Sequence, residues 1–238
     1  MIPLGDSQRR GKGKRRRVLP IVTVGLLLVE LLAFLALIRL PPTAQAAAIA
    51  RWALVPASLA SLLRGDLAAA GESIRLLSSL FLHGGWLHLL GNLLFLWVFG
   101  RAVEAAMGRG RYAGFFVLCG AVAGLVHTLM APTSAVPTVG ASGAISGLMG
   151  AYLGLHPRAR VRSLVFLLFV PIVAEVPALL WLLAWLALQL AEGARAAGAG
   201  PSGGAAAVAW WAHVGGFAGG LLLHRHFLAG PRRAAAAA

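Results

Sequence analysis

The chain has 238 residues, of which 59% are apolar and 12% are charged. A chain of this length with so little charge would be hard to keep in solution. Several of its apolar runs approach the roughly 20 residues needed to cross a hydrocarbon core about 30 Å thick. The composition therefore favours an integral membrane protein over a large soluble helical core.

The formal net charge of +14 follows the pattern of a membrane topology. Seven of the 21 lysines and arginines lie before residue 18, and three each lie within 101–111, 158–162 and 225–233. These groups alternate with apolar runs as one side of a membrane would, and only five basic residues fall on the other side. We interpret the charge as a determinant of orientation and a contact for anionic lipid, and we expect no nucleic-acid partner.

The N-terminal part predicts a basic tail and a first membrane span. Residues 1–17 are polar and basic and are expected to form a disordered cytoplasmic tail, and Val18–Ile38 is the first span. A secretory signal peptide is the rival interpretation, because Ala44–Ala46 resembles a small-residue cleavage site. The apolar run of about 21 residues is longer than the 7–15 of a signal core, which favours the span.

Residues 41–85 predict a long external loop. They are too polar to cross the bilayer, but the amphipathic stretches Leu54–Leu63 and Ile74–Leu82 suit the plane of the interface. Five further apolar segments follow, at about 86–103, 112–131, 142–155, 176–191 and 208–224.

The stretch 163–177 is ambiguous, because Pro171, Glu175 and Pro177 interrupt what would otherwise be one long apolar run. Proline removes a backbone donor and a buried charge is costly, so a straight helix through them is not expected. We place Leu164–Val173 as an interfacial segment on the cytoplasmic face and begin the fifth span near Pro177.

The fold class predicted is an all-α membrane protein, a bundle of six transmembrane helices with both termini cytoplasmic. The membrane domain covers residues 18–228, and residues 229–238 form a C-terminal tail. A linker rich in Gly, Ser and Ala, at about 197–207, joins the fifth and sixth spans outside.

Ser142 opens the fourth span within Gly140-Ala141-Ser142-Gly143. The 14 residues from Ser142 to Leu155 make about 21 Å of helix. If the helix ends at the cytoplasmic surface, its start lies about 9 Å below the outer edge of a core about 30 Å thick. Free N–H groups at that depth cannot face lipid, so Ser142 is expected at the floor of a wet cavity.

His213 and Asn92 fall at a similar depth, about 7–9 Å inside their spans. Polar groups at membrane depth face the interior and usually serve function. Glycines spaced by three to four residues mark the fourth and sixth spans and allow close helix packing, which could bring Ser142 and His213 within hydrogen-bond reach. These glycines are Gly143, Gly147, Gly150, Gly154, Gly216 and Gly220.

His88 and Asn92 are four residues apart and share one helix face. Together with the Ser142 backbone N–H they are candidate donors to the oxyanion of an acyl-transfer intermediate. An interfacial histidine and a packing asparagine are the alternative interpretations.

The sequence predicts neither a metal site nor a cofactor. His83 and His88 are five residues apart without a His-Glu-x-x-His pattern. Only Glu30 and Glu175 approach membrane depth, and neither is expected at the level of His213. A Ser-His dyad is therefore favoured over a Ser-His-Asp triad.

Three runs of the sequence resemble the signatures of the rhomboid family, in the family's order. They are FLHGGWLHLLGNLLFLWVFGRAVE, VGASGAISGLMGAYLG and AWWAHVGGFAGG. The resemblance implies a six-helix fold that cleaves transmembrane substrates in or near the bilayer. By motif position it implies Ser142 as nucleophile, His213 as general base, and His88 and Asn92 as oxyanion donors, with Gly140 in the loop leading to the nucleophile.

The resemblance further implies that the fifth span and the loop after it form a lateral gate and cap, and that Glu104 holds a structural position at the cytoplasmic end. One departure is Ser146, which stands where some members carry an aromatic residue that stacks on the histidine. His213 must then be oriented by another group, with Trp210 or Trp211 as candidates.

The expected function is intramembrane serine endopeptidase activity on single-span membrane proteins. A catalytically inactive rhomboid-like binder of membrane clients is the alternative, although inactive relatives typically lack the serine or histidine. A transporter is disfavoured, because polarity is confined to one side of the membrane. The Ala/Gly/Arg-rich composition suggests a bacterial plasma membrane, and the sequence leaves the oligomeric state open.

Overall fold

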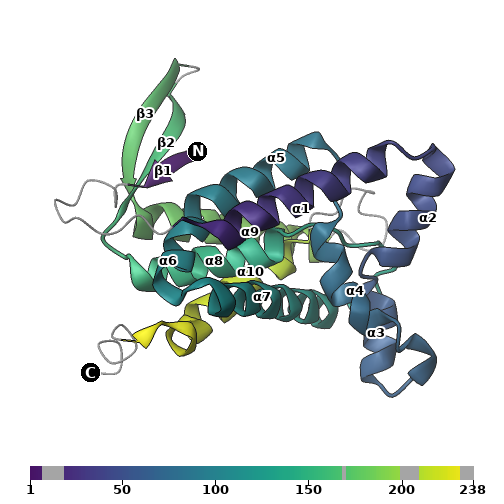
Figure 1. The fold of residues 1–238 in the computed structure, drawn as a ribbon. Coiled ribbons are helices and arrows are strands. Elements are labelled where there is room, and N and C mark those ends of the chain that lie inside the picture. Colours follow the sequence, from purple (N-terminus) through teal and green to yellow (C-terminus); the bar gives the residue numbers. More distant parts are fainter. Residues whose placement is uncertain (7–18, 168–169, 199–208, 231–238) are drawn as a thin grey trace.

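Helices cover the six apolar stretches of the sequence (Figure 1). The structure is a computed structural model that describes residues 1–6, 19–167, 170–198 and 209–230. The six helical stretches are α1 (Ile21–Ile38), the continuous helix of α5 (Trp86–Phe95), η4 (Leu96–Gly100) and α6 (Arg101–Met107), then α7 (Arg109–Met130), α8 (Ser142–Leu155), α9 (Ala178–Gly198) and α10 (Trp210–Leu223).

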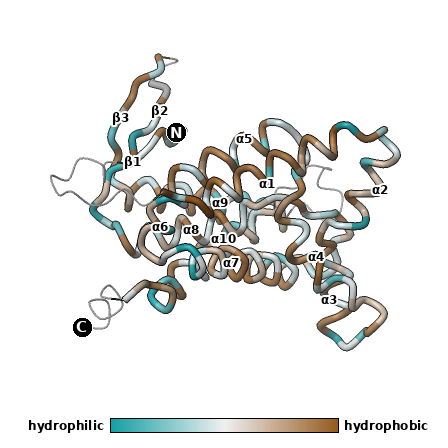
Figure 2. Tube along the Cα trace, viewed as in Figure 1, coloured by the Kyte–Doolittle hydropathy of each residue, from teal (hydrophilic) through white to brown (hydrophobic). Residues whose placement is uncertain are grey.

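Among the described residues, four helices are long and apolar enough to cross a membrane. They are α1, the continuous helix Trp86–Met107, α7 and residues Ala178–Ala197 of α9. Apolar residues run along much of α1 and α7 (Figure 2). The fourteen residues of α8 and of α10 make about 21 Å of helix each, less than the thickness of a hydrocarbon core.

The helix α8 is buried along its length, from Gly143 to Leu153. Its tightest contact is with α10, where the two backbones touch. A Cβ built on Gly150 would meet the Phe217 carbonyl oxygen, and one built on Gly220 would meet the carbonyl of Gly147. No larger residue fits at these positions without moving a helix, so the close packing expected from the glycine spacing is confirmed.

The stretch between α1 and α5 folds into short helices packed at one end of the bundle (Figure 1). These are α2 (Pro42–Trp52), α3 (Pro56–Leu63), η2 (Leu67–Ala69), α4 (Glu72–Ser78) and η3 (Ser79–Phe81). Both amphipathic stretches of the predicted loop are thus largely helical. Leu54 exchanges two backbone hydrogen bonds with Thr138, at 3.1 and 2.7 Å, which ties this region to the segment that leads into α8.

A small antiparallel sheet corrects the all-α prediction. It has the order β1 (Ile2–Asp6), β2 (Arg160–Leu167), β3 (Val170–Pro177). Residues 160–167 and 170–177 therefore pair as antiparallel strands before α9 begins at Ala178, close to the predicted start near Pro177. The run is rich in β-branched residues, and its prolines are tolerated in β3 because that strand lies at the sheet edge.

The strand β1 also corrects part of the prediction that the N-terminal tail is disordered. Residues 2–6 pair with β2 instead of lacking structure, whereas residues 7–18 lie outside the described part of the chain. Most of the predicted 197–207 linker and residues 231–238 of the C-terminal tail also lie outside it.

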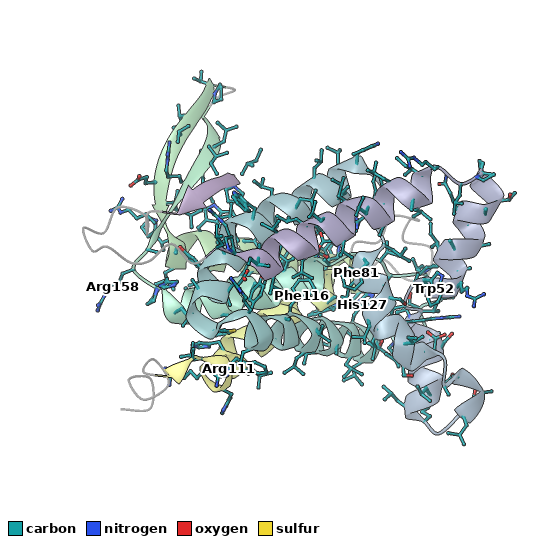
Figure 3. All side chains as sticks on the ribbon, viewed as in Figure 1. Trp52, Phe81, Arg111, Phe116, His127 and Arg158 are labelled. Carbon is teal, nitrogen blue, oxygen red and sulfur yellow. The ribbon has the colours of Figure 1, made fainter. Side chains whose placement is uncertain are left out.

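Glu104 fixes the start of α1 against the bundle. Its carboxylate accepts hydrogen bonds from the Val22 and Thr23 backbone N–H groups, at 3.0 and 2.8 Å, and from the Thr23 hydroxyl at 2.7 Å. A carboxylate at a helix N-terminus also interacts favourably with the helix dipole. Figure 3 places Arg111 and Arg158 toward the bundle end that carries the sheet, and Trp52 toward the opposite end.

Candidate active site

Ser142 and His213 meet where α8 and α10 begin. His213 Nε2 lies 2.8 Å from Ser142 Oγ, although 71 residues separate them in sequence. Ser142 is the first residue of α8 and His213 is the fourth of α10. Because the two helices pack closely, the first turns that carry these residues lie beside each other. Ser142 is partly exposed, whereas His213 is buried at 8% exposure.

The loop before Ser142 brings His88 and Asn92 to the same place. Gly140 has φ +116°, a conformation that favours glycine, and its N–H donates to Ser79 O at 2.9 Å. A Cβ on Gly140 would lie 2.6 Å from His88 Nε2 and 3.5 Å from Asn92 Nδ2. Both side chains therefore border the loop that leads into α8, and Gly140 makes room for them.

Gly143, the residue after Ser142, sits at the meeting point of three helices. A Cβ there would lie 2.6 Å from the Cβ of Ala123 in α7 and 3.6 Å from the Cβ of Ala212 in α10. The small residue therefore lets α8 start close against both neighbours.

Asn92 is held by His83, a residue of the loop before α5. The Asn92 Nδ2 lies 2.8 Å from His83 Nε2, and both side chains are buried. Burial, with a smaller contribution from His88, lowers the pKa of His83 to about 4, so the imidazole is neutral near pH 7. Its Nε2 can then accept from one hydrogen of the Asn92 amide, which leaves the second hydrogen free to donate elsewhere.

Glu30 is the third member of this buried group. Its carboxylate lies 3.9 Å from His83 Nε2, and both side chains are fully buried. Within the described part of the chain, neither Glu30 oxygen has a hydrogen-bond partner. Because His83 is neutral, we do not count this approach as an ion pair. We refer to Glu30, His83 and Asn92 as the Glu30 cluster.

The other face of His213 contacts residues that sequence reasoning largely missed. His213 Nδ1 lies 2.7 Å from Gln189 Oε1 on α9. The ring also packs against Trp185, at 5.9 Å between centroids, and edge-on against Trp210, at 6.1 Å. Trp210 was one of the two expected partners, whereas the Trp211 ring borders Gly193.

A signal for Gln189 was present in the sequence. It is a polar residue inside an apolar run, and polar groups at membrane depth usually face the interior. The same depth argument that singles out Asn92 and His213 therefore also indicates Gln189. Ser146 does not take the orienting role, because its hydroxyl donates to the Ser142 carbonyl at 2.6 Å.

No group of three or more histidines, cysteines or acids in the described residues is arranged to hold a metal ion. The chemistry that the arrangement offers is that of a hydroxyl beside an imidazole, with amide and imidazole donors nearby. This set suits acyl transfer.

Comparison with known proteins gives the same family that the sequence signatures resemble. The family model described as Rhomboid domain matches residues 70–229. "Rhomboid protease GluP" of Bacillus subtilis is 41% identical over 88 residues, which cover 37% of this chain and 17% of that protein. "Rhomboid protease GlpG" of Salmonella newport is 32% identical over 131 residues, or 53% of this chain and 45% of that protein.

"Rhomboid-like protein 11, chloroplastic" of Arabidopsis thaliana is 44% identical over 68 residues, or 29% of this chain and 24% of that protein. The matches thus span less than half the length of each of these relatives. A chloroplast protein among them means that the similarity does not single out the bacterial membrane expected from composition. The family match, together with helices apolar enough to cross a bilayer, shows that the chain belongs to the rhomboid family of integral membrane proteins.

Proposed function

We propose that this protein is an intramembrane serine endopeptidase that hydrolyses a peptide bond in or near the transmembrane segment of a membrane protein. The observation that carries the proposal is the 2.8 Å approach of Ser142 Oγ and His213 Nε2, at the start of a short buried helix. The protease names of the relatives from Bacillus subtilis and Salmonella newport support it.

In the proposed reaction, Ser142 Oγ attacks the carbonyl carbon while His213 Nε2 takes the hydroxyl proton. The tetrahedral intermediate then collapses, the peptide C–N bond breaks, and His213 gives its proton to the leaving amine. Water, deprotonated by the same nitrogen, hydrolyses the acyl ester and releases Ser142. His213 thus acts as base and acid in turn.

The oxyanion of the intermediate needs donors aimed at one point. The free hydrogen of the Asn92 amide, the His88 imidazole and the Ser142 backbone N–H are the proposed set. The first residues of a helix leave their N–H groups without partners inside the helix, so the start of α8 supplies one donor. His88 and Asn92 border the same loop, as the spacing around Gly140 shows.

The proposed topology has six spans with both termini cytoplasmic, which places the start of α8 below the outer surface. Water reaches Ser142 from that side. The substrate is a single-span protein whose helix unwinds near its outer end, because a hydrogen-bonded helix does not present its carbonyl for attack.

The test uses the full chain, purified in detergent, with a fluorophosphonate probe and a generic transmembrane substrate. We expect the wild type to label and cleave, and Ser142→Ala and His213→Ala to do neither. Ser146→Ala, one turn further along the same helix, is the matched control and should still label. Full cleavage by Ser142→Ala would refute the proposal. A folded wild type that neither labels nor cleaves would instead indicate a non-catalytic binder of membrane clients.

A further inference from the structure

Gln189 extends the contact between Ser142 and His213 to a third helix. Its Oε1 lies 2.7 Å from His213 Nδ1, and the opposite ring nitrogen lies 2.8 Å from Ser142 Oγ. The three side chains form one hydrogen-bonded row drawn from α9, α10 and α8. Gln189 is 4% exposed, so water competes little for its carbonyl oxygen.

The direction of the Gln189 amide follows from its second hydrogen bond. Its Nε2 donates to the Trp185 carbonyl oxygen, one turn earlier in α9, at 3.3 Å. The oxygen is therefore the atom that faces His213, and it can only accept. His213 must then carry its hydrogen on Nδ1, which leaves the Nε2 lone pair directed at the Ser142 hydroxyl. A general base needs that tautomer.

The surroundings leave Gln189 as the polar group that fixes the ring. Trp185 and Trp210 pack on the imidazole and restrict its tilt, but neither is within hydrogen-bond reach of Nδ1 in the described contacts. Ser146 is engaged with the Ser142 carbonyl. A carboxylate in the same position would hold Nδ1–H and also stabilise the imidazolium, whereas a neutral amide supplies the orientation without the charge.

We propose that Gln189 is the positioning residue of the Ser142–His213 pair, an uncharged third member that selects the tautomer and orientation of His213. The inference rests on the proposed peptidase function. It also makes the geometry of the pair depend on α9, because the amide reaches His213 only while α9 packs against α10. Displacement of α9 away from α10 would leave the base free to rotate.

The test compares Gln189→Leu and Gln189→Glu in the full-length protein in detergent. For Gln189→Leu we expect kcat and the fluorophosphonate labelling rate to fall about tenfold to a hundredfold, with KM little changed. For Gln189→Glu we expect cleavage to persist and the acid limb of its pH–rate profile to move up by about one pH unit or more, because a carboxylate favours the imidazolium. A residue at 189 that only fills space between the helices, without contacting Nδ1, would not move that profile.

Leu188→Met is the matched control, an exposed neighbour on the same helix that should behave as wild type. Should Gln189→Leu fail to fold, the pH profile of the nearly isosteric Gln189→Glu decides. A wild-type profile for Gln189→Glu, or wild-type kcat for a folded Gln189→Leu, would overturn the inference. If Ser142→Ala still cleaves, the peptidase proposal itself fails. If Ser142→Ala is inactive while Gln189→Leu cleaves as the wild type does, only the proposed role of Gln189 is refuted.

Discussion

The two sides of the candidate site are built differently. On the α8–α10 side, backbones touch across glycines and His213 has a partner at each ring nitrogen. On the α1–α5 side, the Glu30 cluster holds Asn92 through one hydrogen bond but leaves a buried carboxyl group without a partner among the described residues. Buried polar groups usually have hydrogen-bond partners. The α8–α10 side therefore fixes the position of His213, whereas the α1–α5 side lowers the stability of the fold through a carboxyl group that is unpaired among the described residues.

The largest effect should come from adding a methyl group where the backbones of α8 and α10 touch. In Gly220→Ala the new methyl group would overlap the Gly147 carbonyl, which is backbone and cannot rotate away. We expect the protein to lose about 1–3 kcal/mol or more of stability, together with fluorophosphonate labelling. Thermal melting and labelling rate in detergent measure the two effects.

Gly219→Ala is the matched control for that change. Its methyl group would meet the Val122 side chain, 2.9 Å away, which can move. Equal losses in the two variants would show that the backbone contact is not what fixes this side.

On the other side, Asn92→Ala should act on turnover. We expect kcat to fall about a hundredfold to a thousandfold, because one of the proposed oxyanion donors is removed. KM and melting temperature should change much less than kcat. Gln45→Ala, an amide on α2 away from Ser142, serves as the control and should leave kcat unchanged. A kcat within twofold of wild type would leave Asn92 with a packing role only.

Two buried acids allow the free-energy cost of an unpaired buried carboxyl group to be measured. Glu104 accepts three hydrogen bonds at the start of α1, whereas Glu30 accepts none within the described residues. We expect Glu30→Met to raise the free energy of unfolding by about 1–3 kcal/mol, since it removes an unsatisfied buried group. Glu104→Met should lower it by a similar amount, because three donors lose their acceptor. Destabilisation by Glu30→Met would point to a partner for Glu30.

The smallest expected effect is at Gly25 in α1, where a new Cβ would meet nothing within 4 Å. Gly25→Ala should raise stability by about 0.5–1 kcal/mol through helix propensity alone. Unchanged labelling would show that Gly25, unlike the glycines of the α8–α10 contact, is not required by packing. A loss as large as that of Gly220→Ala would remove this distinction.

Much of this arrangement was readable from the sequence, because its signals are local or periodic. The glycine spacing predicted the contact of α8 and α10. The similar depths of Asn92, Ser142 and His213 in their predicted spans indicated that the three residues belong to one site. Apolar runs placed the starts of the six helical stretches to within a few residues, whereas α9 continues to Gly198, seven residues beyond the predicted end.

The rest depended on contacts between distant segments. The pairing of β1 with β2 joins residues 155 to 162 positions apart, and no local pattern in 2–6 indicates a partner. The position of Glu30 beside His83 depends on how α1 lies against the loop before α5. The contact of Gln189 with His213 differs, since a polar residue in an apolar helix is a local signal, but its partner lies on another helix.

The attachment of α1 at Glu104 has a consequence for insertions and deletions. Thr23, which Glu104 holds, precedes Glu30 by seven residues, so the two lie on nearly the same face about 10 Å apart along the helix axis. Removing one residue between them would turn every later side chain by about 100° relative to the anchored end. Glu30 would swing away from His83, and the partly buried Leu31 would take its place in the interior. The length of this half of α1 is therefore as constrained as its composition.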